Sequence, residues 1–261
     1  MDAQRESGSD GADRMRGGRN TAAAAADTAS DAPSGTPAVA VVVPAHNEAS
    51  RIALTVLAAR RLPGVDLVVV VDAGSTDSTA RVAEESGAEV VRLGAKVGRT
   101  AALLRGIRLV ADADPAGADP RHLLLLDADL QQSAAEAVRL LEPVLAGTAD
   151  LVLAGAEPEA ARTARGAARA ARRGIARATG FATTRPLAAE LCLTRAAFTA
   201  AEPLSEGSGA GPGLIIDLLR QGFRVLEVPV PWDHRASRRG LRARLREAAR
   251  RREVRRALAS R

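Results

Sequence analysis

Carboxylates and small polar side chains follow three apolar runs in the first half of the chain. The runs are followed by Pro44-Ala45-His46-Asn47-Glu48, by Asp72-Ala73-Gly74-Ser75-Thr76-Asp77 and by Asp127-Ala128-Asp129. A carboxylate at the end of a buried strand is costly unless it has a partner, so each cluster is a candidate binding site. Asp77 could instead cap a helix, and Asn47 could form a turn.

The pair Asp127 and Asp129 gives the sharpest of these signals. Alternation along a strand end places two carboxylates that are spaced by one residue on the same side. Paired carboxylate oxygens suit Mg²⁺ or Mn²⁺, which also take phosphate oxygens as ligands. A metal there would hold a diphosphate and stabilise it as a leaving group. The D-x-D pattern is common by chance, and its weight comes from its place after Leu123-Leu124-Leu125-Leu126.

Strand-like and helix-like segments alternate around these clusters. Short apolar runs predict buried strands over 38–43, 66–71, 89–93, 122–126 and 150–153. Helical patterns occupy 50–61, 76–86, 99–111 and 133–146. We expect Ser133 and Glu136 to form a capping box for the last of these helices. The alternation predicts an α/β fold with a mostly parallel sheet, in which ligands bind beyond the carboxyl ends of the strands.

The second half of the chain is less regular. We predict a helix over 160–179, a glycine-rich loop over 207–213, a helix over 214–220, a strand over 224–230 and a basic helix over 241–258. Residues 1–36 lack an apolar period, which predicts a disordered leader. Residues 37–235 would then form one domain, and 236–261 an Arg-rich helix or tail.

Composition excludes several classes of protein. Aromatic residues make up 2% of the chain, too few for a base-stacking surface, and the single cysteine excludes an internal disulfide. Residues 235–261 hold 12 Arg against Glu247 and Glu253, a net charge of +10, which leaves −4 for residues 1–234. A slightly acidic body argues against a nucleic-acid partner. No apolar run is long enough for a transmembrane helix, so we expect a cytoplasmic protein.

Three segments carry a resemblance to a known family. VVVPAHNEASRI, VVVVDAGSTDST and LLLLDADLQ, in this order, resemble the nucleotide-sugar-binding half of family-2-type glycosyltransferases with the GT-A fold. The resemblance covers about residues 38–155. It implies a mostly parallel central sheet flanked by helices, and transfer of a sugar from a nucleotide-diphospho sugar, with a UDP-sugar as the expected donor, to an acceptor that the resemblance does not identify.

The same resemblance implies a set of nucleotide-sugar-binding residues. It places Asp72 at the base or ribose, Asp127 near the ribose and Asp129 on the metal. Gly98-Arg99-Thr100 stands where the family often has Gly-Lys-Gly, so Arg99 keeps the positive charge with a different geometry. The other candidates for this pocket are Pro44, Ala45, Asn47, Glu48, Gly74, Ser75 and Ala128.

The second half is similar to the glucosyl-3-phosphoglycerate synthases and their bacterial relatives. Arg185-Pro186-Leu187-Ala188-Ala189-Glu190, GSGAGPGLIID at 207–217 and Asp233-His234-Arg235 resemble segments of that branch. The likeness implies that His234 completes the metal site with Asp127 and Asp129. Glu190 is our catalytic candidate, as the residue that would orient the sugar or the acceptor.

Several positions depart from that branch. Ala188-Ala189 replaces Ser-Gly, Gly211 stands where the branch has Glu, and Ala73 replaces a common acidic or Ser residue. The donor half therefore looks intact and the acceptor half altered. Two alternatives stay open: a catalytically degenerate GT-A-like binding or scaffold protein, and a polyprenyl-phosphate sugar transferase.

Arginines form two further candidate surfaces. One predicted helix carries a basic face that is either solvated or a cradle for a phosphorylated acceptor, made of Arg162, Arg165, Arg169, Arg172 and Arg173. The C-terminal helix has a thin apolar stripe, which predicts a solvated tail or a peripheral contact with an anionic membrane at its inner face. A homodimer is also left open.

Overall fold

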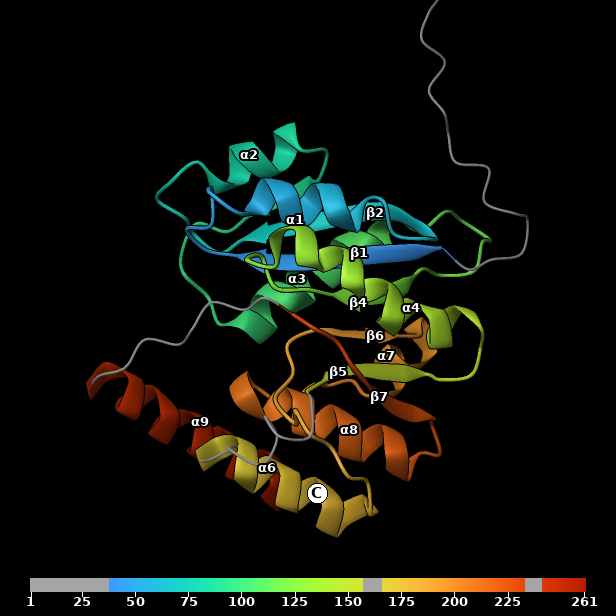
Figure 1. Ribbon diagram of the computed structural model, residues 1–261, viewed down its shortest axis with the longest axis vertical. Helices are drawn as coiled ribbons and strands as arrows, with labels where there is room; N and C mark the ends of the chain where they lie inside the picture. The colour runs from blue at the N-terminus through green and yellow to red at the C-terminus, as the bar shows by residue number, and fades with distance from the viewer. Residues whose placement is uncertain (1–37, 157–165, 233–240) are drawn as a thin grey trace, which may run out of the picture. The chain divides into compact units, whose positions relative to one another are not determined.

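The computed structural model describes residues 38–156, 166–232 and 241–261, so the predicted leader over 1–36 lies outside the described residues. These residues form a mixed sheet of order β3-β2-β1-β4-β6-β5-β7 (Figure 1). Its strands are β1 (Val39–Ala45), β2 (Val65–Asp72), β3 (Glu89–Arg92), β4 (His122–Leu125), β5 (Leu151–Gly155), β6 (Leu191–Leu193) and β7 (Val225–Pro229). Strand β6 runs antiparallel to β4 and β5, and the other neighbours are parallel. The predicted α/β class is confirmed.

Helices cover both faces of this sheet. They are α1 (Ile52–Ala59), α2 (Thr79–Glu85), α3 (Arg99–Asp112), α4 (Val138–Leu145), α6 (Gly166–Thr179), α7 (Arg195–Ala200), α8 (Ala210–Arg220) and α9 (Leu241–Ala259), with 3₁₀ turns η1 (Gln131–Ala137) and η2 (Gly207–Gly209). Among the described residues, none of these helices combines the length and the apolar character that crossing a membrane requires.

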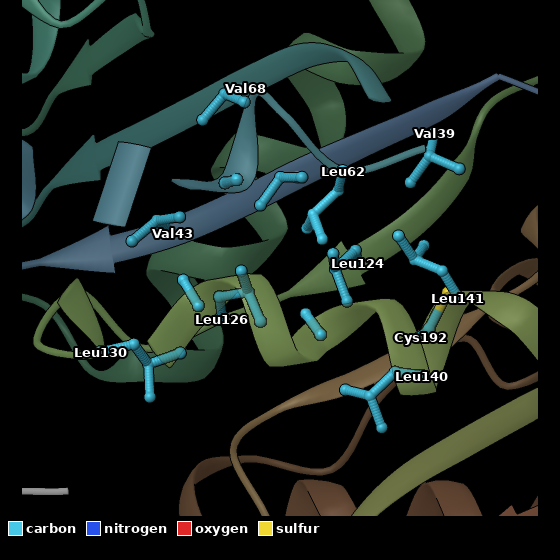
Figure 2. Close-up of a cluster of buried hydrophobic side chains, with 14 of the residues drawn as sticks. Val39, Val43, Leu62, Val68, Leu124, Leu126, Leu130, Leu140, Leu141 and Cys192 are labelled. Carbon is cyan, nitrogen blue, oxygen red and sulfur yellow. The ribbon is translucent and has the colours of Figure 1, made fainter. Parts of the chain in front are cut away.

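Two apolar clusters follow from the alternation along the strands. Val41 and Val43 face α1 and α4, and Figure 2 shows the cluster that they join around Leu124, Leu126 and Leu140. The intervening side chains of β1 and β4 face α3, α7 and α8 on the other side. Burial on both faces explains why the strands read as continuous apolar runs in the sequence.

The capping box predicted at Ser133 and Glu136 is wrong. The Ser133 hydroxyl donates to the Leu130 carbonyl at 2.6 Å, and Glu136 pairs with Arg139 at 3.0 Å. The segment begins as the 3₁₀ turn η1, because the backbone entering it is held elsewhere: the N–H of Gln131 donates to Thr55 Oγ1 at 2.8 Å.

The glycine-rich loop predicted over 207–213 is also wrong. Residues 207–209 form η2, and α8 begins at Ala210. Pro212 lies in the first turn of α8, where a missing N–H costs nothing. Strand β6 and helix α7 were not predicted, because three residues are too few for a periodic pattern and Arg195–Ala200 is one short helix.

Helix α9 is packed against the domain and is not a solvated tail. Val254 is fully buried and contacts Ala167 and Ala171 of α6, which lies beside α9 (Figure 1). The Glu247 carboxylate accepts a hydrogen bond from the Ala167 N–H at 2.6 Å, and Arg261 donates to Asp217 at 2.6 Å. These contacts hold α9 against the domain although its apolar stripe is thin, and the thin stripe is the reason why a tail was expected.

Candidate functional site

The candidate site lies where the order of the sheet reverses. Strand β1 has β2 on one side and β4 on the other, so the chain builds outward from β1 in both directions. Ala45 at the end of β1 pairs in register with Asp72 at the end of β2, and Asp127 follows the end of β4. Ligands of open α/β sheets bind at such a switch point.

Two loops on this edge are locked into one another. The Asn47 N–H donates to Ser75 Oγ at 2.9 Å, and Asn47 Oδ1 accepts from the Thr76 N–H at 2.8 Å. The Glu48 N–H donates to Thr79 Oγ1 at 2.9 Å. Asn47 has φ of 57°, a left-handed conformation that Asn tolerates well. The polar atoms of Asn47 and Ser75 therefore hold the shape of the loop that follows β1.

Asp77 has a structural role at the start of α2, although the N-cap residue of this helix is Ser78. Its carboxylate accepts hydrogen bonds from the backbone of Thr79 at 3.0 Å and of Ala49 at 3.2 Å. Partial burial opposes ionisation, but these hydrogen bonds and that of the Thr79 hydroxyl outweigh it and lower the pKa of Asp77. Asp77 therefore joins the start of α2 to the loop that precedes α1.

Asp72 and Gly74 shape the end of β2. The Asp72 side chain is 7% exposed and accepts a hydrogen bond from the Ser75 N–H at 3.0 Å. Gly74 has φ of +72°, and a Cβ there would lie 2.8 Å from the carbonyl carbon of Ala95. Both the left-handed backbone and the close approach of Ala95 require glycine.

The turn that carries Asp127 and Asp129 is anchored from beneath. The buried Thr55 of α1 donates to the Ala128 carbonyl at 2.9 Å, and the same hydroxyl accepts from the Gln131 N–H. Above the turn, the Asp127 carboxylate pairs with the Arg99 guanidinium, which also donates to the Ala189 carbonyl at 3.0 Å. Arg99 thus connects the turn after β4 to the segment before β6.

The donor set on this turn suits a hard divalent cation. Asp127 and Asp129 supply two carboxylates from one turn, and both are half-buried. Asp127 is paired with Arg99, whereas Asp129 accepts no hydrogen bond from any residue that the structure describes. Within those residues no third His, Cys, Asp or Glu joins them, and His234 lies outside the described ranges. The oxygen chemistry fits Mg²⁺ or Mn²⁺ with two protein ligands.

Glu190 is fully buried immediately before β6, the strand next to β4. Its carboxylate lies 3.6 Å from the Arg185 guanidinium. Burial, followed by the charge of Asp127, raises the pKa of Glu190, and the charges of Arg185 and Arg99 offset part of the rise, so that the pKa reaches about 7. Glu190 therefore exchanges a proton near neutral pH, within the electrostatic reach of Asp127.

A cavity of about 390 Å³ opens beside Asp127. Arg99 and Asp127 line it together with side chains of the sheet and of α3, α7 and α8. The altered positions Ala188, Ala189 and Gly211 also line it. The departures in the second half of the chain therefore gather around one space next to Asp127, whereas Ala73 does not line it.

The predicted basic face is split by the structure. Arg169 and Arg173 of α6 are exposed, whereas Arg172 donates to the Thr184 carbonyl at 3.2 Å and supports the fold. Arg162 and Arg165 lie outside the described residues.

Sequence reasoning missed two residues that position the site. One is Thr55, and the other is Glu227, whose carboxylate accepts hydrogen bonds from the N–H of Thr184 at 2.8 Å and of Arg185 at 3.2 Å. Thr55 stands alone among apolar residues and Glu227 in a strand-like run, so no motif identifies either one.

Comparison with known proteins agrees with this geometry. Residues 40–163 match the sequence profile of Glycosyl transferase family 2. Glycosyltransferase AglJ of Haloferax volcanii is 28% identical over 200 residues, which cover 75% of this chain and 63% of that protein. The chain thus spans less than two thirds of the length of this relative.

Solved structures of glucosyl-3-phosphoglycerate synthase from Mycobacterium tuberculosis share the fold. The complex with phosphoglyceric acid has a TM-score of 0.66 and 26% identity, covering 87% of this chain and 80% of that one. The complex with Mn²⁺, UDP and phosphoglyceric acid has a TM-score of 0.67 and 26% identity, covering 87% and 78%. A third, with Mg²⁺ and UDP, has a TM-score of 0.65, 26% identity and coverage of 87% and 79%.

The profile match spans β1 to β5, the strands whose ends hold Asp72, Asp127 and Asp129. The structural likeness extends over the second half, where β6 and Glu190 adjoin that edge. Residues 40–163 are therefore similar to glycosyl transferase family 2, within a chain that has the GT-A fold.

Proposed function

We propose that this protein transfers a sugar from a nucleotide-diphospho sugar, with a UDP-sugar as donor, to an acceptor that enters beside Glu190. The observation that carries the proposal is the convergence of Asp72, Asp127 and Asp129 at the switch point of the sheet. The match of residues 40–163 to the family 2 profile supports it, as do the UDP complexes of the structural neighbours.

The donor would lie across the ends of β1 and β2. Pro44, Ala45 and Glu48 would line the nucleotide, with Asp72 at the base or ribose. The interlocked loops support this assignment, because the hydrogen bonds of Asn47 and Ser75 hold the loop in shape before any ligand binds. A pre-shaped loop spares the ordering cost of binding.

Asp129, assisted by Asp127, would hold a Mg²⁺ or Mn²⁺ ion. When bound, the ion supplies positive charge that stabilises the departing diphosphate. Arg99 would add a second positive charge from the first turn of α3. Asp127 holds Arg99 at the mouth of the site in the structure, which keeps the guanidinium oriented for a diphosphate. His234 stays a proposed third ligand.

Glu190 would serve the acceptor side. It immediately precedes β6, whose neighbour β4 leads to Asp127, and Arg185 lies 3.6 Å from its carboxylate. A carboxyl group with a pKa of about 7 can accept or donate a hydrogen bond at neutral pH. We propose that Glu190 orients a hydroxyl of the sugar or of the acceptor.

Contact with an anionic membrane would use α9. Exposed arginines, such as Arg251 and Arg255, remain on this helix after its other side has packed on α6. Sedimentation with vesicles that contain phosphatidylserine tests the contact, which should weaken as salt rises.

Calorimetric titration of UDP, UDP-glucose and GDP-mannose, each with and without Mn²⁺, tests the proposed function. We expect Mn²⁺-dependent binding of one nucleotide, lost in Asp129→Ala and kept in Asp119→Ala, a matched change at an exposed carboxylate. Absence of binding by the folded protein would overturn an active transferase and favour a degenerate scaffold.

A further inference from the structure

The cavity beside Asp127 has an apolar interior. Its apolar walls include Leu125 of the sheet strand β4 and side chains of three helices that pack on that face: Leu103 and Ile107 of α3, Phe198 of α7 and Leu214 of α8. At about 390 Å³ it falls within the range of small-molecule sites, about 300–1,000 Å³.

Small residues keep this space open. Ala188, Ala189, Ala210 and Gly211 line it where larger side chains would fill it. A Cβ on Gly211 would meet only the carbonyl oxygen of Pro186, at 3.6 Å, so a side chain there would extend into free space. The cavity is thus a consequence of residue size and not of a distorted backbone.

The polar groups of the cavity include two guanidinium groups and one carboxylate. Arg99 and Asp127 are shared with the donor site, and Arg250 comes from α9. The wall next to Arg250 is held in place, because the Glu253 carboxylate accepts a hydrogen bond from the Ser208 N–H at 2.8 Å. Asp127 is paired with Arg99, whereas Arg250 forms no ion pair with a residue that the structure describes, so Arg250 is the cation of this wall that can complement an anion.

We propose that the cavity binds the aliphatic part of an anionic amphiphile, with its charged head group beside Arg250. The proposal rests on the proposed function, in that this amphiphile is the acceptor. Phosphoglyceric acid, which is bound in a structural neighbour, is small and polar and has no apolar part to occupy such a space. Burial of a chain in this cavity removes apolar surface from water on both partners.

Chain length provides the first test, on the unmodified protein. We expect the affinity for alkyl phosphates, measured by calorimetry below their micellar concentrations, to rise about fourfold per methylene from butyl to octyl phosphate. The rise should stop once the cavity is filled. Octanoate tests whether the head must be a phosphate, since a carboxylate carries the same sign of charge. Affinity that does not depend on chain length would overturn the proposal.

Variants provide the second test. Gly211→Leu and Ala188→Leu fill the cavity from two different walls, and each should weaken octyl phosphate binding at least tenfold. Ala111→Leu adds the same side chain at an exposed position of α3 and should change nothing. Arg250→Ala should weaken octyl phosphate binding about tenfold, whereas Arg251→Ala, at an exposed position of the same helix, should not.

UDP binding in the presence of Mn²⁺ is measured on the same samples. Octyl phosphate binding without UDP binding would leave the cavity assigned and overturn the transferase. UDP binding together with an alkyl phosphate affinity that does not depend on chain length would support the transferase and overturn the assignment of the cavity. Gly211→Leu and Ala188→Leu should keep UDP binding, which also shows that these variants are folded.

Discussion

The Arg99 guanidinium rests on the Asp127 carboxylate, and through it α3 is joined to the turn that carries the D-x-D pair. The same guanidinium reaches the Ala189 carbonyl at 3.0 Å. One side chain thus contacts both the proposed donor side and the segment that leads to Glu190. Both side chains are about one third exposed, so solvent screens their attraction and the ion pair adds little to the stability of the fold. Its main effect is to orient the Arg99 guanidinium.

Removal of Arg99 should weaken nucleotide binding. We expect Arg99→Ala to lower the affinity for UDP with Mn²⁺ about tenfold, equivalent to about 1.4 kcal/mol. The UDP affinity of Arg99→Lys should lie between those of wild type and Arg99→Ala, because an ammonium keeps the charge of the guanidinium but loses its paired geometry. Calorimetry gives both values. Arg108→Ala, at an exposed position of α3, is the control, and equal affinities for all four proteins would contradict the assignment.

Glu190 should make stability depend on pH. Its pKa is about 7 in the fold and near 4.5 when unfolded, so the folded state binds more protons between these values. Stability therefore falls as pH rises from about 4.5 to about 7 and levels off above that. Glu190→Gln removes this contribution.

The measurement is the difference in Tm between wild type and Glu190→Gln across that window. The Tm of Glu190→Gln should rise relative to the Tm of wild type as the pH rises, because the neutral amide of the variant places no charge in the interior. A difference in Tm that is constant from pH 4.5 to 8 would show that the carboxyl group titrates normally.

Gly74→Ala should be costly. The change combines a left-handed φ of +72° with a Cβ placed 2.8 Å from the Ala95 carbonyl carbon. We expect the free energy of unfolding to fall by about 2–4 kcal/mol, measured by urea denaturation. Gly117→Ala shares the positive φ, at +81°, but its Cβ meets nothing within 4 Å. It should cost about 1–2 kcal/mol, and equal losses at the two positions would show that the contact with Ala95 is unimportant.

Packing of α9 predicts an effect of Val254. Because this side chain is fully buried against α6, Val254→Ala should lower the free energy of unfolding by about 1–3 kcal/mol. Arg255→Ala changes an exposed neighbour and should stay within about 0.5 kcal/mol of wild type. If Val254→Ala also leaves the free energy of unfolding unchanged, α9 is not packed against α6 in solution.

The sequence predicted the strands of the first half and the meeting of their ends well, because the strand ends there carry their own signals. Asp72 and Asp127 follow long apolar runs, and the rule for parallel sheets brings such ends together. The role of Thr55 could not be predicted, since its partner Ala128 lies 73 positions away and a lone threonine carries no motif. The burial of α9 escaped prediction for a related reason: its apolar contact rests on two small buried side chains, Val254 and Ala257, and its remaining contacts are polar and distant in sequence.

Strand β6 has a consequence for the order in which the chain can assemble. In the described sheet it stands between β4 and β5, although it follows β5 in the sequence. During synthesis, β5 therefore emerges without its neighbour on the side of β4 and must wait for Leu191–Leu193 before it can join the first four strands. The β1–β4 unit can form early, whereas the wall that carries Glu190 closes late, through a junction of three residues. Ribosome-bound chains that stop before residue 191 should thus protect the β1–β4 unit from proteases while leaving β5 open to cleavage.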